Sequence, residues 1–238
     1  IAIGTDAGVG TGDDPVNPGF DKTSHIAIGT RAGQNVVGNQ TTAIGYQAGS
    51  GIVGDNTVSV GSHAGERLDG DHNISIGYRA NARDASTEVE HAVAIGGLTT
   101  AATGSVAVGE QAQAIGRYAT VMGFNARATD DNGVALGANA RAAGDSVALG
   151  SNSQAVASTG VGFLTGSNAA GNPISVVSVG GGGGSAATRR ITNVADGSAL
   201  TDAVNVRQLA AAQQNLADIL GQGTIVDGKV VGFKVGST

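Results

Sequence analysis

The stretch IAIGTRAGQNVVGNQTTAIGYQAG, residues 26–49, contains two copies of one short pattern that decides the fold. In each copy a small residue lies between two larger ones, glycine follows, and alanine comes three residues after the glycine. The first half of this pattern recurs along the first 180 residues. The clear copies are IAIG (1–4 and 26–29), TAIG (42–45), VSVG (58–61), ISIG (74–77), VAIG (93–96), VAVG (106–109) and VALG (134–137 and 147–150); weaker copies are QAIG (113–116), TVMG (120–123) and VSVG (177–180).

The repeated glycines give the period. They are 16 residues apart from 29 to 77, 14 apart from 109 to 137, and 13 apart from 137 to 150. Two short strands and two turns per period predict an all-β solenoid, in which each coil buries its apolar face only against its neighbours. Glycine allows a backbone bend that a Cβ atom would obstruct. We therefore predict repeat turn glycines at Gly29, Gly45, Gly61, Gly77, Gly96, Gly109, Gly123, Gly137 and Gly150.

Strand alternation assigns faces to the repeat, because successive side chains in a strand point to opposite sides. Val93 and Ile95 share one face and Ala94 takes the other. We expect the branched residues to be buried and the small middle residues to face outward, where a neighbouring subunit could approach closely. Alanine three residues after glycine predicts a second, inward-facing short strand, at Ala32, Ala48, Ala64, Ala80, Ala126 and Ala140.

Three segments interrupt the period and are expected to be loops inserted at solenoid corners. They are residues 9–25, which contain two of the three prolines, the charged residues 82–92, and residues 163–173.

The last quarter of the chain has a different character. Five glycines at 180–184 precede a helical pattern with Thr201 or Asp202 as the expected N-cap, Leu220 at its end and Gly221 as the C-terminal cap. The spacing of its apolar residues indicates a coiled-coil seam, and a single amphipathic helix packed on the solenoid end is the alternative. The seam runs through Val206, Leu209, Gln213, Leu216 and Leu220, or in a second register through Leu209, Ala212, Leu216 and Ile219.

A further β element is expected after the helix. Asp227-Gly228 lies between β-branched residues, which is a strong hairpin signal. The chain begins inside a repeat, without the charged and apolar segments of a signal peptide, so we expect it to be a piece of a longer protein.

Composition excludes several classes of function. The formal charge is −6 and the 13 Lys and Arg residues are scattered, which argues against nucleic acid. Cysteine is absent, which excludes thiol chemistry. The Gly- and Asp-rich stretches at 8–14 and 69–73 do not recur as calcium loops do, and no glycine run is followed by the GK[ST] of a phosphate loop. We predict no cofactor, no metal site and no catalytic residue.

The enzymatic alternative is a hexapeptide-repeat acyltransferase, which is also a solenoid. Its period of six does not fit steps of 16, 14 and 13. Such an enzyme also needs a histidine base at a subunit interface. Each histidine here lies at an expected turn or insertion, where exposure is the default, and the chain is predicted not to be an enzyme. These residues are His25, His63, His72 and His91.

Two segments together resemble the trimeric autotransporter adhesins with a YadA-like head. The repeats of residues 1–180 are similar to the head, and RRITNVADGSALTDAVNVRQL (189–209) is similar to the neck that follows it. The resemblance implies left-handed parallel β-rolls packed around a threefold axis, and a neck that leads to a coiled-coil stalk. The domains implied are the head (1–180), the neck (181–201), the stalk helix (202–221) and the start of a β element (222–238).

The resemblance also implies a homotrimer at the bacterial cell surface, held in the outer membrane by an anchor domain that is not in this chain. We expect adhesion to an extracellular matrix protein or cell-surface receptor of the host, or alternatively a structural spacer in a surface fibre. The outer strand face and the loops at 9–25 and 82–92 are the expected contact regions. The trimer and neck residues are predicted to be Arg189, Arg190, Asp196, Asp202, Val206, Leu209 and Leu216, with intersubunit ion pairs from the two arginines to the two aspartates.

Overall fold

The computed structural model describes residues 1–10, 25–82, 88–156, 175–181, 188–219, 223–226 and 229–232. The chain divides into two compact units, Ile1–Thr188 and Arg189–Thr238. The first unit is a parallel β-solenoid of about nine turns, as predicted, and the second contains one helix and a hairpin.

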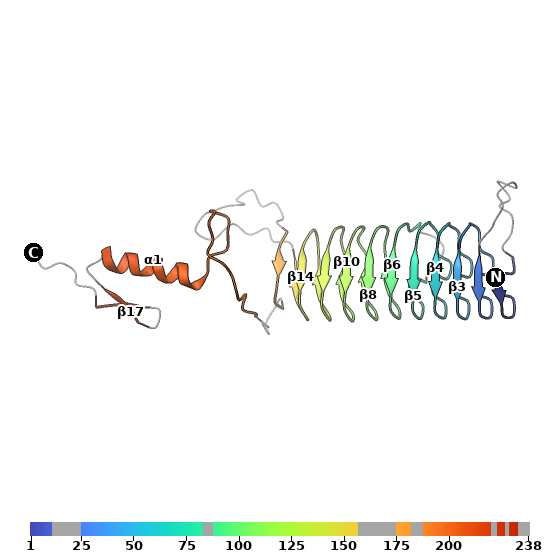
Figure 1. Ribbon diagram of the computed structural model, residues 1–238, viewed down its shortest axis with the longest axis horizontal. Helices are drawn as coiled ribbons and strands as arrows, with labels where there is room; N and C mark the ends of the chain where they lie inside the picture. Colours follow the sequence, from blue (N-terminus) through green and yellow to red (C-terminus); the bar gives the residue numbers. More distant parts are fainter. Residues whose placement is uncertain are drawn as a thin grey trace, which may run out of the picture. The chain divides into compact units, whose positions relative to one another are not determined.

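One wall of the solenoid is a parallel sheet of eleven strands (Figure 1). Each strand comes from one copy of the glycine pattern and pairs in register with its neighbours in the sheet, so that like residues form columns along the axis. The strands, in sheet order, are β1 (Ala2–Ile3), β2 (Ile26–Ile28), β3 (Thr42–Ile44), β4 (Val58–Val60), β5 (Ile74–Ile76), β6 (Val93–Ile95), β8 (Val106–Val108), β10 (Thr120–Met122), β12 (Val134–Leu136), β14 (Val147–Leu149) and β16 (Val177–Ser178).

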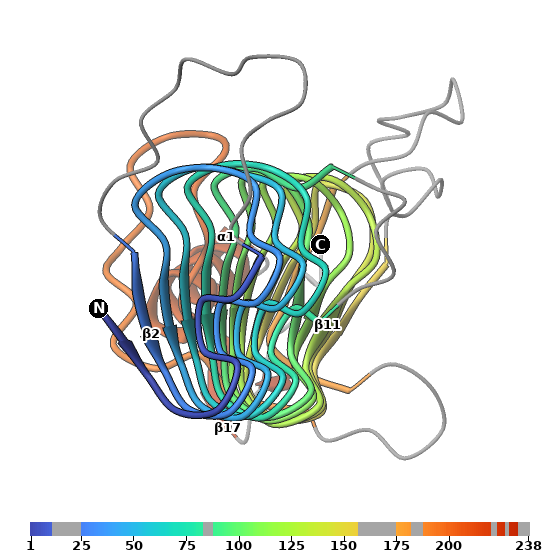
Figure 2. The same ribbon diagram turned by 90° about the vertical axis from the view of Figure 1, so that its right-hand side faces the viewer.

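A second wall carries a five-stranded parallel sheet. The end-on view in Figure 2 shows β2 and β11 on different walls of the stacked coils. QAIG (113–116) contributes β9 to this sheet, so it is not a copy of the main repeat: it lies half a coil after Gly109. The strands are β7 (Thr100–Ala101), β9 (Gln113–Ala114), β11 (Arg127–Ala128), β13 (Arg141–Ala142) and β15 (Gln154–Ala155).

The predicted faces of the main repeat are wrong. The small middle residues line the interior, where Ala94 and Ala107 are fully buried, and the flanking branched residues point outward, with Ile95 36% exposed. The reason is the width of the coil. A Cβ atom added to Gly33 would lie 3.3 Å from the Cβ of Ala27 and 3.6 Å from that of Ala43, so only methyl-sized groups fit beside the main strands at this level of the coil.

The two coil lengths differ in what fills the interior. The coils of 16 residues place a larger column inside, formed by Val36, Ile52, Leu68 and Val89. The shorter coils place alanines of the second sheet there, such as Ala114 and Ala128. The alanines three residues after glycine do point inward, as predicted. None of the six lies in a strand, however. Those of the longer coils lie in turns, and Ala126 and Ala140 lie one residue before the second strand begins.

The corner segments are only partly described. Residues 11–24 and 163–173 lie outside the described residues. The expected loop at 82–92 is too long, because Glu88 forms a parallel bridge with Asp69 and Val89 is part of the core. Residues 88–92 therefore belong to the coil, and 83–87 lie outside the described residues.

The repeat glycines stack as a column at one corner. The nine predicted repeat glycines, from Gly29 to Gly150, have φ between +104° and +139°. A Cβ on Gly96 would lie 2.6 Å from the carbonyl oxygen of Gly109 in the next coil. The residue two positions after each glycine is also left-handed, for example Asn125 and Asn139, whose side chains hydrogen-bond across coils at 2.9 Å.

In the second unit, helix α1 (Val206–Ile219) begins three or four residues later than the predicted N-cap, Asp202 or Thr201, would place it. Asn205 is the N-cap, because its Oδ1 accepts the N–H of Gln208 at 3.0 Å. Leu220 and Gly221 lie outside the described residues. The hairpin prediction is confirmed by the antiparallel pairing of β17 (Thr224–Val226) with β18 (Lys229–Val231), which leaves two residues for the turn.

Adjacent glycines offer a matched test of the glycine column. Gly96→Ala is expected to lower the free energy of unfolding by about 1–3 kcal/mol, because a left-handed φ and a backbone contact both oppose the new methyl group. Gly97→Ala, whose Cβ would meet nothing closer than 3.8 Å, is expected to change it by less than about 0.5 kcal/mol. Chemical denaturation of both variants measures the difference, and equal stabilities would contradict the column's role.

Candidate interaction surfaces in the neck, the helix and the main sheet

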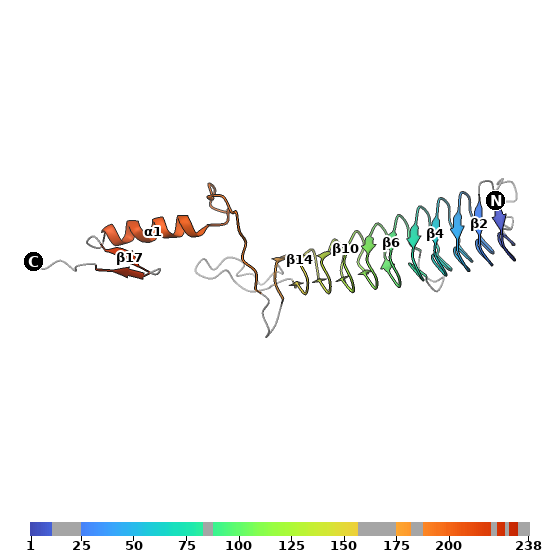
Figure 3. The ribbon, with the colours of Figure 1, turned by 60° about the horizontal axis from the view of Figure 1, so that its bottom comes forward.

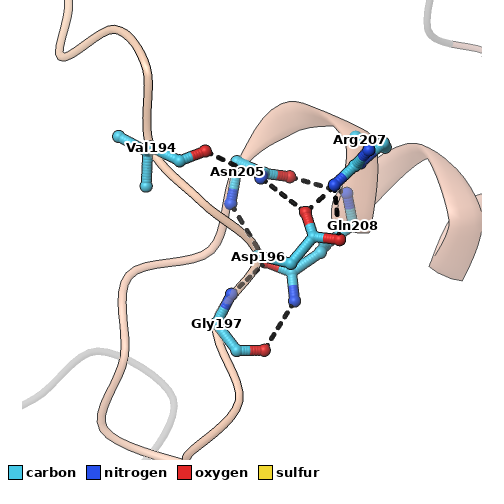
Figure 4. A network of polar contacts seen from close by, with 6 residues as sticks. All are labelled: Val194, Asp196, Gly197, Asn205, Arg207 and Gln208. Carbon is cyan, nitrogen blue, oxygen red and sulfur yellow. Dashed lines mark hydrogen bonds and ion pairs between the residues drawn. The ribbon is translucent and has the colours of Figure 1, made fainter.

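The segment before α1 is tied to the first turn of the helix by a network that we call the neck clamp, formed by Val194, Asp196, Gly197, Asn205, Arg207 and Gln208 (Figure 4). Asp196 is at its centre. Arg207 donates to both carboxylate oxygens, from Nε at 3.2 Å and from a terminal nitrogen at 2.7 Å. Asn205 donates through Nδ2 to Asp196 Oδ1 at 2.7 Å and to the Val194 carbonyl at 3.0 Å.

Gln208 closes the clamp with its side-chain amide. The Oε1 atom accepts the N–H of Gly197 at 2.9 Å, and Nε2 donates to the Gly197 carbonyl at the same distance. Oε1 also accepts the N–H of Asn205 at 3.4 Å, while Asn205 caps Gln208 in return. This reciprocal pair is a capping box with asparagine and glutamine as its members.

Asp202 shapes the loop between the two halves of the clamp. Its Oδ2 accepts the N–H groups of Ser198 and Ala199, both at 2.9 Å. A Cβ on Gly197 would lie 2.9 Å from the Cβ of Asp202, which explains glycine at that position. Backbone hydrogen bonds from Ala199 and Ser198 lower the pKa of Asp202 below its ordinary value of 3.8.

The predicted ion pairs of Arg189 and Arg190 concern other subunits, and they stay a prediction. Both arginines are exposed in the single chain. Within the chain Asp196 pairs instead with Arg207, a residue that sequence reasoning missed. A signal was present: an arginine in the first turn of a helix opposes the helix dipole, so it indicates a nearby anion.

Helix α1 carries an exposed apolar stripe that contains both predicted seam registers as far as Ile219. Val206 is 82% exposed, Leu209 54%, Leu216 52% and Ile219 81%. The adjoining side contacts the hairpin, since Ala217 is buried and its carbonyl accepts the N–H of Gly223 at 3.2 Å. A helix of 14 residues is marginal alone in water, so its stripe favours a helical partner.

The outer face of the eleven-stranded sheet is a second apolar stripe, which we call the sheet stripe. It consists of the first and third residues of each strand, and Figure 3 shows these strands following one another along the solenoid. Eleven strands at a spacing of about 4.8 Å give it a length of roughly 48 Å. Its outward members include Ile26, Ile44, Val58, Val60, Ile76, Val93, Ile95, Val106, Val108, Val134 and Leu149.

Neither a metal-binding cluster nor a membrane-spanning helix occurs among the described residues. These residues contain no group of three or more metal-binding side chains and no helix with the length and hydrophobicity needed to cross a bilayer. The histidines serve local contacts at turns: His63 is 2.8 Å from Glu66, and His72 stacks on His91 with ring centroids 4.8 Å apart.

Acid is expected to open the neck clamp. Hydrogen bonds from Arg207 and then Asn205 lower the pKa of Asp196 from its ordinary value of 3.8. The folded clamp therefore gains stability above that pH, and loses it progressively as the pH falls below 3.8 through the lower folded value. Helix content followed by circular dichroism from pH 6 to 2 measures this loss.

The Asp196→Asn variant should reduce that acid transition, and should start from a less helical state at pH 6. The control is Asp218→Asn, which changes an aspartate on α1 that lies outside the clamp. An unchanged acid transition in Asp196→Asn would show that the clamp does not govern the helix.

Comparisons with known proteins agree with this division of the chain. Residues 190–230 match the coiled stalk of trimeric autotransporter adhesin, and residues 101–123 and 114–140 match two copies of the YadA head domain repeat. No curated protein sequence matches the chain. Among solved structures, the collagen-binding domain of the Yersinia adhesin YadA is similar over 86% of this chain and 95% of that chain, with 23% identity and a TM-score of 0.44.

Head repeats precede a coiled stalk in these matches, in the order that the repeat and the neck-like segment predict. Proteins of this kind are non-enzymatic adhesins, exposed on the cell surface and anchored in the outer membrane. Residues 101–140 of this chain are therefore similar to the head repeats of the trimeric autotransporter adhesins, and residues 190–230 are similar to their coiled stalk.

Proposed function

We propose that this chain is the head and upper stalk of a homotrimer that presents an adhesive surface to host cells or extracellular matrix. The observation that carries the proposal is the sheet stripe. Soluble monomers rarely expose continuous apolar patches larger than a few hundred Å². The sheet stripe is a continuous row of branched apolar side chains roughly 48 Å long, which is unusual for a monomer, so it favours burial in an assembly.

Three copies of this chain are the occupant that fits the stripe. The stripe is straight, regular and nearly free of charge, so identical copies can pack along their whole length around a common axis. Helix α1 carries a second uncovered stripe, and the stalk match is to a trimeric coiled coil. One threefold assembly would therefore bury both stripes of the chain.

The neck clamp supports this role within each chain. It fixes the path of residues 194–197 against the first turn of α1. Because Arg207 already neutralises Asp196, the proposed intersubunit pairs of Arg189 and Arg190 would need Asp202 or a shared use of Asp196. Both aspartates remain partly open to a second donor at the surface.

A charge placed on the sheet stripe tests the trimer. Val108→Asp puts three carboxylates at the proposed axis, and an unpaired buried charge costs several kcal/mol per ion. We expect this variant to sediment as a monomer in analytical ultracentrifugation, with its β-sheet circular dichroism retained. Gln113→Asp, which adds the same charge on the other wall, should remain trimeric.

A monomeric wild-type chain would defeat the trimer outright. A Val108→Asp variant that sediments as a stable trimer would place the interface on some other face of the solenoid.

Binding to matrix proteins tests the adhesive role. We expect the wild-type trimer to bind at least one of immobilised collagen, fibronectin and laminin with saturable kinetics, as measured by surface plasmon resonance. A structural spacer predicts no binding to any of the three. A trimer that fails on all of them and on cultured host cells would favour the spacer.

A further inference from the structure

The outer face of the five-stranded sheet carries two arginines side by side. Arg127 and Arg141 are direct partners in the parallel register of β11 and β13. Their neighbours in the same column are Gln113 on β9 and Gln154 on β15. Since alternate residues Ala128 and Ala142 are buried, the two arginines point outward, and both are exposed.

These arginines lie in a hollow rather than on a flat wall. A cavity of about 360 Å³ is lined by Arg127, Thr129, Arg141, Ala143, Gln154 and Val156. This volume is at the small end of the range for ligand sites. Its polar groups are mostly hydrogen-bond donors, and each guanidinium offers a planar fork that matches sulfate or carboxylate oxygens.

Within the described part of the chain, the two charges have no carboxylate partner. Among the residues that the structure describes, no carboxylate oxygen lies within 4.0 Å of either guanidinium. Like charges on adjacent strands destabilise a sheet. In a chain with a net charge of −6, this pair is an uncompensated local feature that an external anion would stabilise.

Two acidic residues that follow the arginines closely in the sequence are held by other contacts. Asp130 accepts the N–H of Gly144 and the hydroxyl of Thr129, both at 2.9 Å, and the Gly144 bond lowers its pKa. Asp145 accepts the side-chain amide of Asn132 at 3.0 Å. The carboxylates at this corner therefore stabilise turns between coils.

We propose that the column formed by Gln113, Arg127, Arg141 and Gln154, which we call the arginine ladder, binds a sulfated polysaccharide that lies along the solenoid axis. Adjacent strands are about 4.8 Å apart, so the ladder repeats its donors at the short, regular interval that a linear polyanion can match. The glutamines on either side can hydrogen-bond hydroxyl groups. The inference rests on the proposed adhesive role and names one class of ligand for it.

An acidic peptide fits this surface less well. Extended peptides bind sheets by pairing with a free edge strand. Both edges of this sheet already have partners: the N–H of Gln154 on β15 donates to Gly180 at 3.0 Å, and that of Ala101 on β7 donates to Asn81 Oδ1 at 3.1 Å. The cavity also lacks the aromatic anchors that dominate most peptide and protein interfaces.

The test compares three double variants of the full 238-residue chain in heparin binding by isothermal titration calorimetry. Arg127→Gln/Arg141→Gln is expected to weaken binding about a hundredfold or more, because each of the two charge-assisted hydrogen-bonding groups contributes about tenfold or more. Arg79→Gln/Arg117→Gln removes the same charge from exposed arginines elsewhere on the solenoid and should bind like wild type. Arg127→Lys/Arg141→Lys keeps the charge without the fork and should fall between them.

Several outcomes would overturn the proposal. They are wild-type protein that does not bind heparin, equal losses in the two glutamine variants, and polyglutamate binding as tight as heparin binding. The last result would assign the ladder to acidic peptides. Thermal unfolding of each variant controls for folding. The matrix-protein screen on the same samples separates the two proposals, because matrix binding without heparin binding would leave the adhesive role intact.

Discussion

The narrow interior of the coil is the constraint on which the rest of the structure depends. The walls approach so closely that methyl groups fill the space between them, and at one corner the backbone of each coil lies where a side chain of its neighbour would start. Glycine at the corner and alanine inside follow directly. Most branched residues of the main strands have no room between the walls, so the same constraint sends these apolar side chains outside, while larger residues such as Ile52 are buried only in the longer coils.

Much of the fold could be predicted because it repeats. The step between glycines gives the coil, and Asp227-Gly228 gives the hairpin. The faces could not be assigned from alternation, because alternation separates two faces without saying which one is inside. Our prediction assumed that the larger residues are buried, which holds for wide cores. Here Ala107 is buried and Val106 and Val108 flank it on the outside.

The neck shows a different limit of sequence reasoning. Thr201 and Asp202 are good N-cap residues, but Asp202 is used by the loop that precedes the helix, and Asn205 caps the helix instead. Residue type alone does not decide between two positions that both favour capping. The pairing of Asp196 with Arg207 spans a loop whose path was unknown, so only the unusual position of the arginine pointed to it. The exposed apolar stripe of α1, in contrast, follows from the spacing of apolar residues within one helix.

The two coil lengths have a consequence for how such heads can change over time. Each coil contacts only the coils on either side, and its walls continue theirs residue for residue. Duplication or deletion of one whole coil therefore lengthens or shortens the solenoid without disturbing the pairing between the remaining coils, provided that the coil has the same length as its neighbours. A 16-residue coil placed among 14-residue ones would set a branched side chain such as Ile52 against a column of alanines. Coils can therefore be gained or lost independently in the longer-coil part and in the shorter-coil part of the solenoid. The boundary between the two parts lies near Val89.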